Sequence, residues 1–321
     1  MTPPTPALMK GLFWAATAIL VWSGSLVMLR LGVTTSLNVY DLTAVRFGIS
    51  AIVLAPVALR HRMGLRVLGT GGFITMVGGF GAPYILLMST ALQTAPAAAA
   101  GALNPGVMAI GAVLMGWLLF RDPVGPLRIC GMALILSGGG LISMHSGSFE
   151  IGHLILIGTG FMWCAYTMTV RWKAVPALQA TAYVAVWSAI LFLPVYILLL
   201  PKQIGEAPLI HILGQAIFQG LLVGIAAVFA FNRSAELLGP IAGSTLPALI
   251  PLVSLILGAF FLGEEAGMGQ LGSAILIGAG VAMILAGGRW RRTGQTPAPR
   301  RRREALSSEK RSAPKRVAVP K

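Results

Sequence analysis

A series of long apolar blocks, separated by short polar connections, constrains the fold of this sequence more than any other feature. Each block approaches or exceeds the roughly 20 residues with which an α-helix crosses about 30 Å of hydrocarbon. Hydrophobic residues make up 56% of the chain and charged residues 10%, whereas soluble domains carry about 25% charged residues. We therefore predict an all-α membrane protein with ten transmembrane helices. The predicted helices are 11–30, 41–59, 67–92, 96–120, 127–145, 151–171, 179–200, 208–232, 240–262 and 269–288.

The second half of the chain repeats the first half at an offset of 141 or 142 residues. The corresponding residues are Trp22 and Trp163, Arg30 and Arg171, Gly101 and Gly243, Pro105 and Pro247, and Asp122 and Glu264. Because each half holds an odd number of predicted helices, the second half must enter the membrane in the opposite orientation. Inverted repeats are typical of transporters, whose substrate site lies near the bilayer midplane between the repeats. The sequence thus predicts two inverted five-helix repeats around a central cavity.

Basic residues predict the orientation of these helices. If the N-terminus is cytoplasmic, the basic connections and the tail lie inside, and only Arg30 and Lys202 lie outside. The positive-inside rule describes this bias, so we expect a multi-pass protein with both termini in the cytoplasm. The expected divisions are a cytoplasmic N-terminus (1–10), a first five-helix repeat (11–145), a second, inverted repeat (151–288) and a basic cytoplasmic tail (289–321).

The tail holds most of the net charge of +15, together with several prolines and no apolar periodicity. Such a segment is expected to be disordered. A nucleic-acid-binding arm is one interpretation of the charge. We favour an arm that enforces the orientation of the chain and contacts anionic lipid head groups, with no nucleic-acid partner.

The sequence lacks recognisable catalytic and cofactor-binding patterns. Neither an HExxH zinc motif nor a phosphate-binding GxxxxGKS loop is present, and the four histidines lie at predicted helix ends. Cys130 and Cys164 fall within predicted helices, where reduced thiols serve as packing residues. We therefore expect neither an enzyme nor a resident cofactor or metal ion.

Uncharged residues at mid-helix depth are the candidates for contact with a substrate. Trp22 lies about 16 Å into its predicted helix at 1.5 Å per residue, close to the midplane, and Trp163 reaches a similar depth from the other side. Tryptophan prefers membrane interfaces, so this pair indicates cavity walls; lipid-facing or packing aromatics are the alternative. The predicted substrate-binding residues are Trp22, Tyr84, Met88, Asn104, Trp163, Tyr166, Asn232, Ser244 and Thr245, with Ser23, Ser25, Ser89, Thr167 and Gln219 nearby.

Prolines at corresponding depths predict breaks in two helices. Pro105, Pro247 and Pro251 each remove a backbone donor and clash with the preceding turn. Irregular backbone within a membrane is tolerated where it is buried in protein or lines water. We expect these segments to line the cavity; a plain packing kink is the alternative.

Arg46 is the one cation clearly inside a predicted helix, five residues after Asp41. Its depth places it near the outer interface, so we expect its side chain to snorkel to the head groups. The alternative is an anchor for a carboxylate that moves through the outer half of the membrane. With Arg46 at the interface, the predicted central pocket carries no net charge.

Two duplicated segments resemble the signature of the drug/metabolite transporter superfamily, in particular its ten-helix EamA-type exporters. The first is 91–96 (ALQTAP), with 235–240 (AELLGP) in the second half. The second is 117–122 leading to Gly131, with 261–264 leading to Gly272. The likeness extends over about residues 10–288. The departures from the pattern are Asp122 where the signature usually has Glu, and Ala109 where the second half has Pro251.

Within that family the chain is similar to bacterial inner-membrane exporters of aromatic and other neutral amino acids. The resemblance implies an inverted repeat, a central cavity and alternating access. A multidrug or other metabolite carrier on the same scaffold is the alternative, but the first predicted helix lacks the acidic residue that small multidrug members use for lipophilic cations. We expect a monomer in the lipid bilayer that exports zwitterionic amino acids by facilitated diffusion.

Overall fold

The computed structural model describes residues 6–145, 150–227, 229–230, 234, 237 and 249–287. Within these ranges the regular structure is helical and includes no strand, as predicted. The elements in chain order are α1 (Pro6–Thr35), α2 (Val39–Arg60), the short 3-10 helix η1 (Arg62–Gly64), α3 (Leu65–Phe80), α4 (Ala82–Thr94), α5 (Ala97–Phe120), α6 (Pro126–His145), α7 (Ile151–Lys173), α8 (Ala177–Leu199), α9 (Leu209–Gln215), the π-helix η2 (Ala216–Ala227), α11 (Ile250–Leu262) and α12 (Met268–Gly287).

Seven helical segments in the described part of the chain are long and apolar enough to cross a membrane. Three shorter apolar stretches, Pro126–Leu141, Ile250–Leu262 and Met268–Ile284, accompany them. Together they overlap all ten predicted blocks, although parts of 208–232, 240–262 and 269–288 lie outside the described residues. The total of ten membrane-spanning helices stays a prediction.

The ends of two helices repeat the same local geometry in the two halves of the chain. α5 is followed by Arg121 in the left-handed region (φ 54°), and the next amide, of Asp122, donates to Gly116 O at 3.0 Å. α11 is followed by Gly263 in the same region (φ 65°), and Glu264 N donates to Gly258 O at 3.3 Å. Every member of the second set lies 142 residues after its counterpart. The sequence repeat is therefore also a repeat of backbone conformation at this position.

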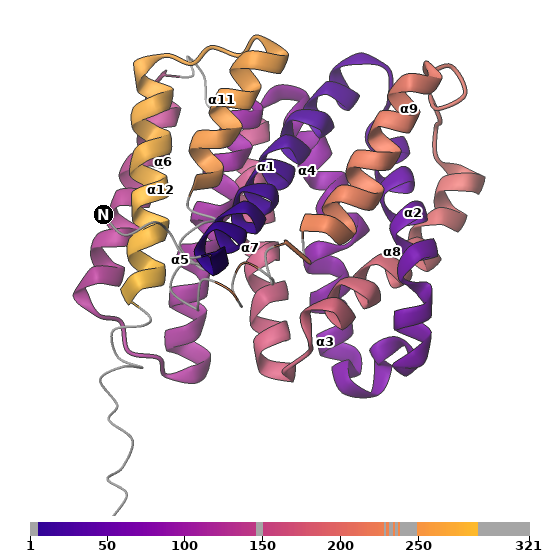
Figure 1. The fold of residues 1–321 in the computed structure, drawn as a ribbon, viewed down its shortest axis with the longest axis horizontal. Helices are drawn as coiled ribbons and strands as arrows, with labels where there is room; N and C mark the ends of the chain where they lie inside the picture. The colour runs from indigo at the N-terminus through magenta and orange to yellow at the C-terminus, as the bar shows by residue number, and fades with distance from the viewer. Residues whose placement is uncertain are drawn as a thin grey trace, which may run out of the picture.

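α6 and α12 pack side by side at one edge of the molecule (Figure 1). Gly131 faces Gly280 so closely that a Cβ atom on Gly131 would lie 2.6 Å from Gly280 O. Further along the same pair of helices, the Ser273 hydroxyl donates to Gly138 O at 2.7 Å. Residue numbers rise along α6 as they fall along α12, so the two helices are antiparallel. The glycines allow the two backbones to approach this closely.

α2, α8 and α9 lie at the opposite edge of the molecule, with α1 crossing between the two edges (Figure 1). At the start of α2, Asp41 accepts a hydrogen bond from Tyr196 OH at 2.7 Å, near the end of α8. Beyond the end of α2, Met63 O accepts from Trp187 Nε1 at 3.0 Å, nearer the start of α8. α2 and α8 are therefore also antiparallel.

Irregular backbone occurs in the two segments 62–94 and 209–227, which contain most of the third and eighth predicted helices. Gly81 separates α3 from α4, and Ala82 N donates to the Ser188 hydroxyl at 3.0 Å instead of to a carbonyl of the helix. A Cβ atom on Gly81 would collide with Val77 O and with Ser188 Oγ. In the second half, α9 continues into the π-helix 216–227. Such π-helical turns are frequent at functional sites.

The predicted helix break at Pro105 was wrong, and Pro251 has a different role from the one predicted. α5 continues through Pro105 from Ala97 to Phe120, because packing against neighbouring helices offsets the one hydrogen bond that proline removes. Pro251 lies in the first turn of α11, where the missing amide proton has no partner in any case. Pro247 lies outside the described residues.

Candidate functional site

Four aromatic rings from three helices meet near the break at Gly81. Phe80, the last residue of α3, stacks on Tyr166 of α7 with ring centroids 4.8 Å apart. Its ring also lies 5.0 Å from that of Tyr84 on α4 and 5.7 Å from that of Trp163 on α7. Trp163 and Tyr166 are half-buried. We call these four residues the aromatic cluster; its rings offer apolar faces for an aromatic or aliphatic group.

A chain of hydrogen bonds joins the aromatic cluster to the neighbouring helices. The Tyr84 hydroxyl donates to Asn104 Oδ1 at 3.1 Å, and Asn104 Nδ2 donates to the Thr159 hydroxyl at 2.8 Å. Thr159 in turn donates to Leu156 O at 2.9 Å. Asn104 is 3% exposed, so its amide is held by α4 and α7 within the protein interior. This arrangement holds the Tyr84 ring in one orientation at the edge of the cluster.

A second polar group, formed by α1, α2 and η2, contains a buried cation. Arg46 Nη1 donates to Gln219 Oε1 at 3.0 Å, and the Ser25 hydroxyl donates to the same oxygen at 3.1 Å. Gln219 Nε2 donates to Ser25 O at 3.0 Å. Arg46 is 9% exposed, and α2, which carries it, packs against α4, which carries Tyr84. The prediction that Arg46 snorkels to the head groups was therefore wrong, because α2 directs the side chain into the helix bundle.

A third polar group ties together three helix ends. Arg30 Nε and Glu264 Oε1 form an ion pair at 3.1 Å, and their side chains are 21% and 10% exposed. Glu264 also accepts from Ala97 N at 2.8 Å, which provides α5 with the N-terminal cap that Pro96 lacks. Arg30 Nη1 donates to Ala95 O at 2.9 Å, beyond the end of α4. We call this group the Arg30–Glu264 clamp; it lies at the end of the bundle that the topology prediction places outside.

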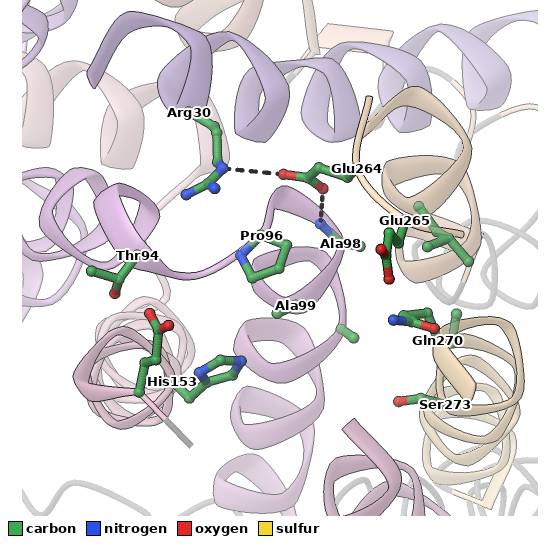
Figure 2. Close-up of a pocket in the computed structure, with 14 residues that line it drawn as sticks. Arg30, Thr94, Pro96, Ala98, Ala99, His153, Glu264, Glu265, Gln270 and Ser273 are labelled. Atoms are coloured by element: carbon green, nitrogen blue, oxygen red, sulfur yellow. Dashed lines mark hydrogen bonds and ion pairs between the residues drawn. The ribbon is translucent and has the colours of Figure 1, made fainter. Parts of the chain in front are cut away.

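A pocket of about 320 Å³ opens beside the clamp (Figure 2). In the close-up, Arg30 and Glu264 face each other across its upper wall, and His153 lies on the opposite side from Glu265, Gln270 and Ser273. Glu150 also lines the pocket, so three carboxylates and one guanidinium border it. Among the described residues, no cluster of three or more histidine, cysteine or acidic side chains is arranged to hold a metal ion.

Comparison with known proteins identifies the architecture that carries these groups. The model of the EamA-like transporter family matches residues 9–144 and again residues 150–286. The chain belongs to the EamA-like transporter family. It is thus a multi-pass membrane transporter for small solutes, built from two EamA repeats.

A solved crystal structure, described simply as that of a protein, supports the fold of this EamA-like chain. It matches with a TM-score of 0.58 and 22% sequence identity, over 85% of this chain and 94% of the other. At this identity the likeness concerns the fold alone. No curated protein matches the chain.

The predicted site residues of this EamA-like transporter fall into three groups. Tyr84, Trp163 and Tyr166 lie in the aromatic cluster, and Asn104 is bonded to it. Trp22 is half-buried on α1 outside the four rings, and Met88 is 2% exposed and packs in the core. The remaining predicted residues, Asn232, Ser244 and Thr245, lie outside the described residues.

Sequence reasoning missed two members of the site and misjudged a third. Phe80 ends the run Gly78–Phe80, directly before the glycine that breaks the helix, and this position was the available signal. Thr159 is one hydroxyl among many in apolar helices, and no sequence signal distinguishes it. Gln219 was seen as a nearby polar residue, but its contact with Arg46 depends on the packing of α2 against η2.

Proposed function

We propose that the protein exports amino acids with aromatic or other neutral side chains, and related small metabolites, across the bacterial inner membrane. The transporter acts as a monomer by alternating access and facilitated diffusion, with both termini in the cytoplasm and no nucleic-acid partner. The aromatic cluster receives the apolar side chain of the solute. Amide and hydroxyl groups beside the cluster, above all Asn104, bind its polar groups.

The observation that carries this proposal is the meeting of four aromatic rings beside irregular backbone. Phe80 and Tyr84 flank the break at Gly81, and Trp163 and Tyr166 reach the same place from α7. Aromatic faces stabilise apolar solutes, while an adjoining row of hydrogen-bonding groups provides orientation. Family membership supports small solutes as the cargo.

We further propose that the two repeats are inverted relative to each other. Support comes from the antiparallel pair α6 and α12. The offset of 142 converts Gly131 into Ser273 and Gly138 into Gly280. The contact of Gly131 with Gly280 is thereby converted into the contact of Ser273 with Gly138, which is the second contact of the same helix pair. A two-fold axis perpendicular to the helices accounts for this exchange, and such an axis lies in the membrane plane.

We propose that the Arg30–Glu264 clamp takes part in alternating access. Its repeat counterparts are Arg171, in the last turn of α7, and Asp122, directly after α5, at the opposite end of the bundle. We propose that the Arg30–Glu264 pair stabilises closure of the outer end. Opening of the outer end then separates Arg30 from Glu264, with glycine-rich seams such as Gly138–Gly140 allowing the helices to rock.

Uptake into liposomes that contain the purified full-length protein tests the proposal. We expect labelled phenylalanine, tryptophan or leucine to enter faster than into protein-free vesicles. Trp163→Ala removes one wall of the aromatic cluster and is expected to lower that uptake. Trp172→Ala is the matched control, because Trp172 lies on the same helix but is 65% exposed. The proposal is wrong if no amino acid in a full panel enters faster than in the protein-free vesicles.

A carrier for cationic drugs or other metabolites on the same scaffold is the second candidate. It is favoured by the pocket beside the clamp, where Glu150 and Glu265 add negative charge that Arg30 does not balance. A growth assay with overexpressing cells separates the two candidates. Resistance to a panel of lipophilic cations, without release of amino acids into the medium, supports the drug carrier.

A further inference from the structure

Arg46 is a buried cation whose hydrogen-bond partner in the described part of the chain is neutral. Its guanidinium has five N–H donors, yet within the described residues it makes one hydrogen bond, to the uncharged amide of Gln219. No carboxylate among the described residues lies within ion-pair distance of Arg46. The ion pair in that part of the chain joins Arg30 to Glu264. A charge removed from water without a counter-charge is strongly unfavourable.

The nearest carboxylate in the sequence is fully engaged elsewhere. Asp41 Oδ2 accepts from Asn38 N at 3.1 Å and from Gln203 N at 3.0 Å. Asp41 Oδ1 accepts from the Tyr196 hydroxyl at 2.7 Å. These bonds hold the carboxylate at the N-terminus of α2, where the helix dipole also stabilises it. Asp41 therefore does not serve as the counter-ion of Arg46.

The surroundings of Arg46 hold the guanidinium in a defined orientation. Gln219 Oε1 accepts from both Ser25 and Arg46, while Gln219 Nε2 donates to Ser25 O, so both ends of the amide are occupied. One terminal nitrogen of Arg46 faces this amide, and the remaining N–H groups have no partner in the described part of the chain. The N–H donors of a guanidinium form a planar fork that matches two carboxylate oxygens.

We infer that Arg46 binds the carboxylate of the transported solute and makes this transporter selective for carboxylate-bearing molecules. The inference rests on the proposed function, since it assigns the anionic end of the same solute whose side chain meets the aromatic cluster. α2, which carries Arg46, packs against α4, which carries Tyr84 of the cluster, so the two parts of the site lie on neighbouring helices. The offset of 141 or 142 gives Trp187 or Ser188 as the counterpart of Arg46, and neither is charged. The site therefore binds one carboxylate per chain.

Three related probes test the inference on purified full-length protein in liposomes. Phenylalanine carries both a carboxylate and an ammonium group, phenylalaninamide carries the ammonium group alone, and 3-phenylpropionate carries the carboxylate alone. Leucine and leucinamide repeat the comparison with a different side chain. We expect the wild type to bind and transport the carboxylates, with the amides weaker by about tenfold or more.

Two variants then change the site in different ways. Arg46→Gln removes the cation, and the preference for carboxylates over amides is expected to disappear. Gln219→Glu keeps Arg46 but places a carboxylate on the atom that it already contacts, so the internal ion pair should compete with the solute and also abolish the preference. Because Gln219→Glu supplies a missing counter-charge, it is expected to fold at least as stably as the wild type. Gln203→Glu, on an exposed loop, is the matched control and should retain the preference.

The outcomes separate this inference from the proposed function. If acids and amides are transported equally well by the wild type, or if both Arg46→Gln and Gln219→Glu keep the preference for acids, the role of Arg46 is refuted while amino-acid export stands. If no acid or amide crosses faster than in protein-free vesicles, the proposed function is wrong and the inference falls with it. Loss of the preference in both variants, with retention in the control, supports it.

Discussion

Arg30 and Arg46 are both largely withdrawn from solvent, but they are stabilised in opposite ways. Arg30 pairs with Glu264 at 3.1 Å and also donates to Leu92 O in the last turn of α4 and to Ala95 O just beyond it. Arg46 has the neutral Gln219 as its hydrogen-bond partner in the described part of the chain. Arg30 thus provides a donor at the end of α4 and balances the charge of the carboxylate that caps α5. Among the described residues, Arg46 caps no helix end and forms no ion pair.

The charge of Arg30 therefore stabilises the folded protein, whereas the buried charge of Arg46 is expected to destabilise it. Charges placed at helix termini satisfy free backbone groups and interact favourably with the helix dipole. A cation buried without a counter-charge costs stability, and such residues within membranes mark functional sites. The two sites should therefore respond oppositely to removal of charge. The free energy of unfolding should fall when a charge of the clamp is removed and rise when the charge of Arg46 is removed.

The largest expected effect is that of Glu264→Gln. This change leaves Arg30 without a counter-charge and weakens the cap on α5, so we expect a loss of about 3 kcal/mol in the free energy of unfolding. Titration of the purified protein with denaturing detergent, followed by circular dichroism, measures it. Glu265→Gln is the matched control, because Glu265 is adjacent and exposed and forms no ion pair in the described part. Equal stability of the two variants contradicts the structural role of the clamp.

Asp41→Asn is expected to cost about 2 kcal/mol of unfolding free energy, since an amide nitrogen cannot replace an oxygen that accepts backbone N–H bonds. Its transport preference for phenylalanine over phenylalaninamide should stay unchanged, because Asp41 is not the counter-ion of Arg46. Exposed Glu206, in the loop before α9, provides the control Glu206→Gln. A change of preference in Asp41→Asn that Glu206→Gln does not share would show that Asp41 balances Arg46, and the contrast between the two arginines would be lost.

The helical architecture could be predicted from the sequence because its signal is local and strong. Runs of apolar residues define membrane helices through backbone hydrogen bonding alone, without knowledge of neighbouring helices. The breaks were harder to place. Pro105 was expected to interrupt a helix and does not, whereas Gly81, an inconspicuous glycine among many, separates α3 from α4. The Gly81 break depends on the hydroxyl of Ser188, more than 100 positions away, so no local rule reveals it.

Half of the candidate site followed from residue type and depth, and the other half depended on packing. Tyr84, Trp163 and Tyr166 were identifiable as aromatics near the middle of their helices. Arg46 was assigned to the interface because depth along a helix was treated as depth in lipid. The direction in which α2 presents Arg46, toward Gln219 of η2, is a property of helix packing that sequence periodicity does not supply.

Arg46→Met is expected to raise the unfolding free energy by about 1 kcal/mol, because an apolar side chain of similar length replaces a buried charge that has no counter-charge among the described residues. Amino-acid transport should fall in the same protein, as is usual when a functional site is less stable than it could be. The same detergent titration measures the gain, with Arg60→Met as control. Arg60 lies exposed at the other end of α2, where a cation favours the helix dipole, so its removal should not stabilise. A destabilised Arg46→Met would mean that Arg46 has a stabilising partner after all.

The smallest expected effect is that of Ser25→Ala, which removes one of the two donors on Gln219 Oε1. The loss should be about 0.5–1 kcal/mol, the net contribution of one neutral hydrogen bond. Thr17→Ala, which deletes an exposed hydroxyl on the same helix, is the control and should cost less. In the Arg46→Met background Ser25 becomes the sole side-chain donor to that oxygen, so the same change should cost more than in the wild type. Equal costs in the two backgrounds would mean that Gln219 does not hold Arg46 in position.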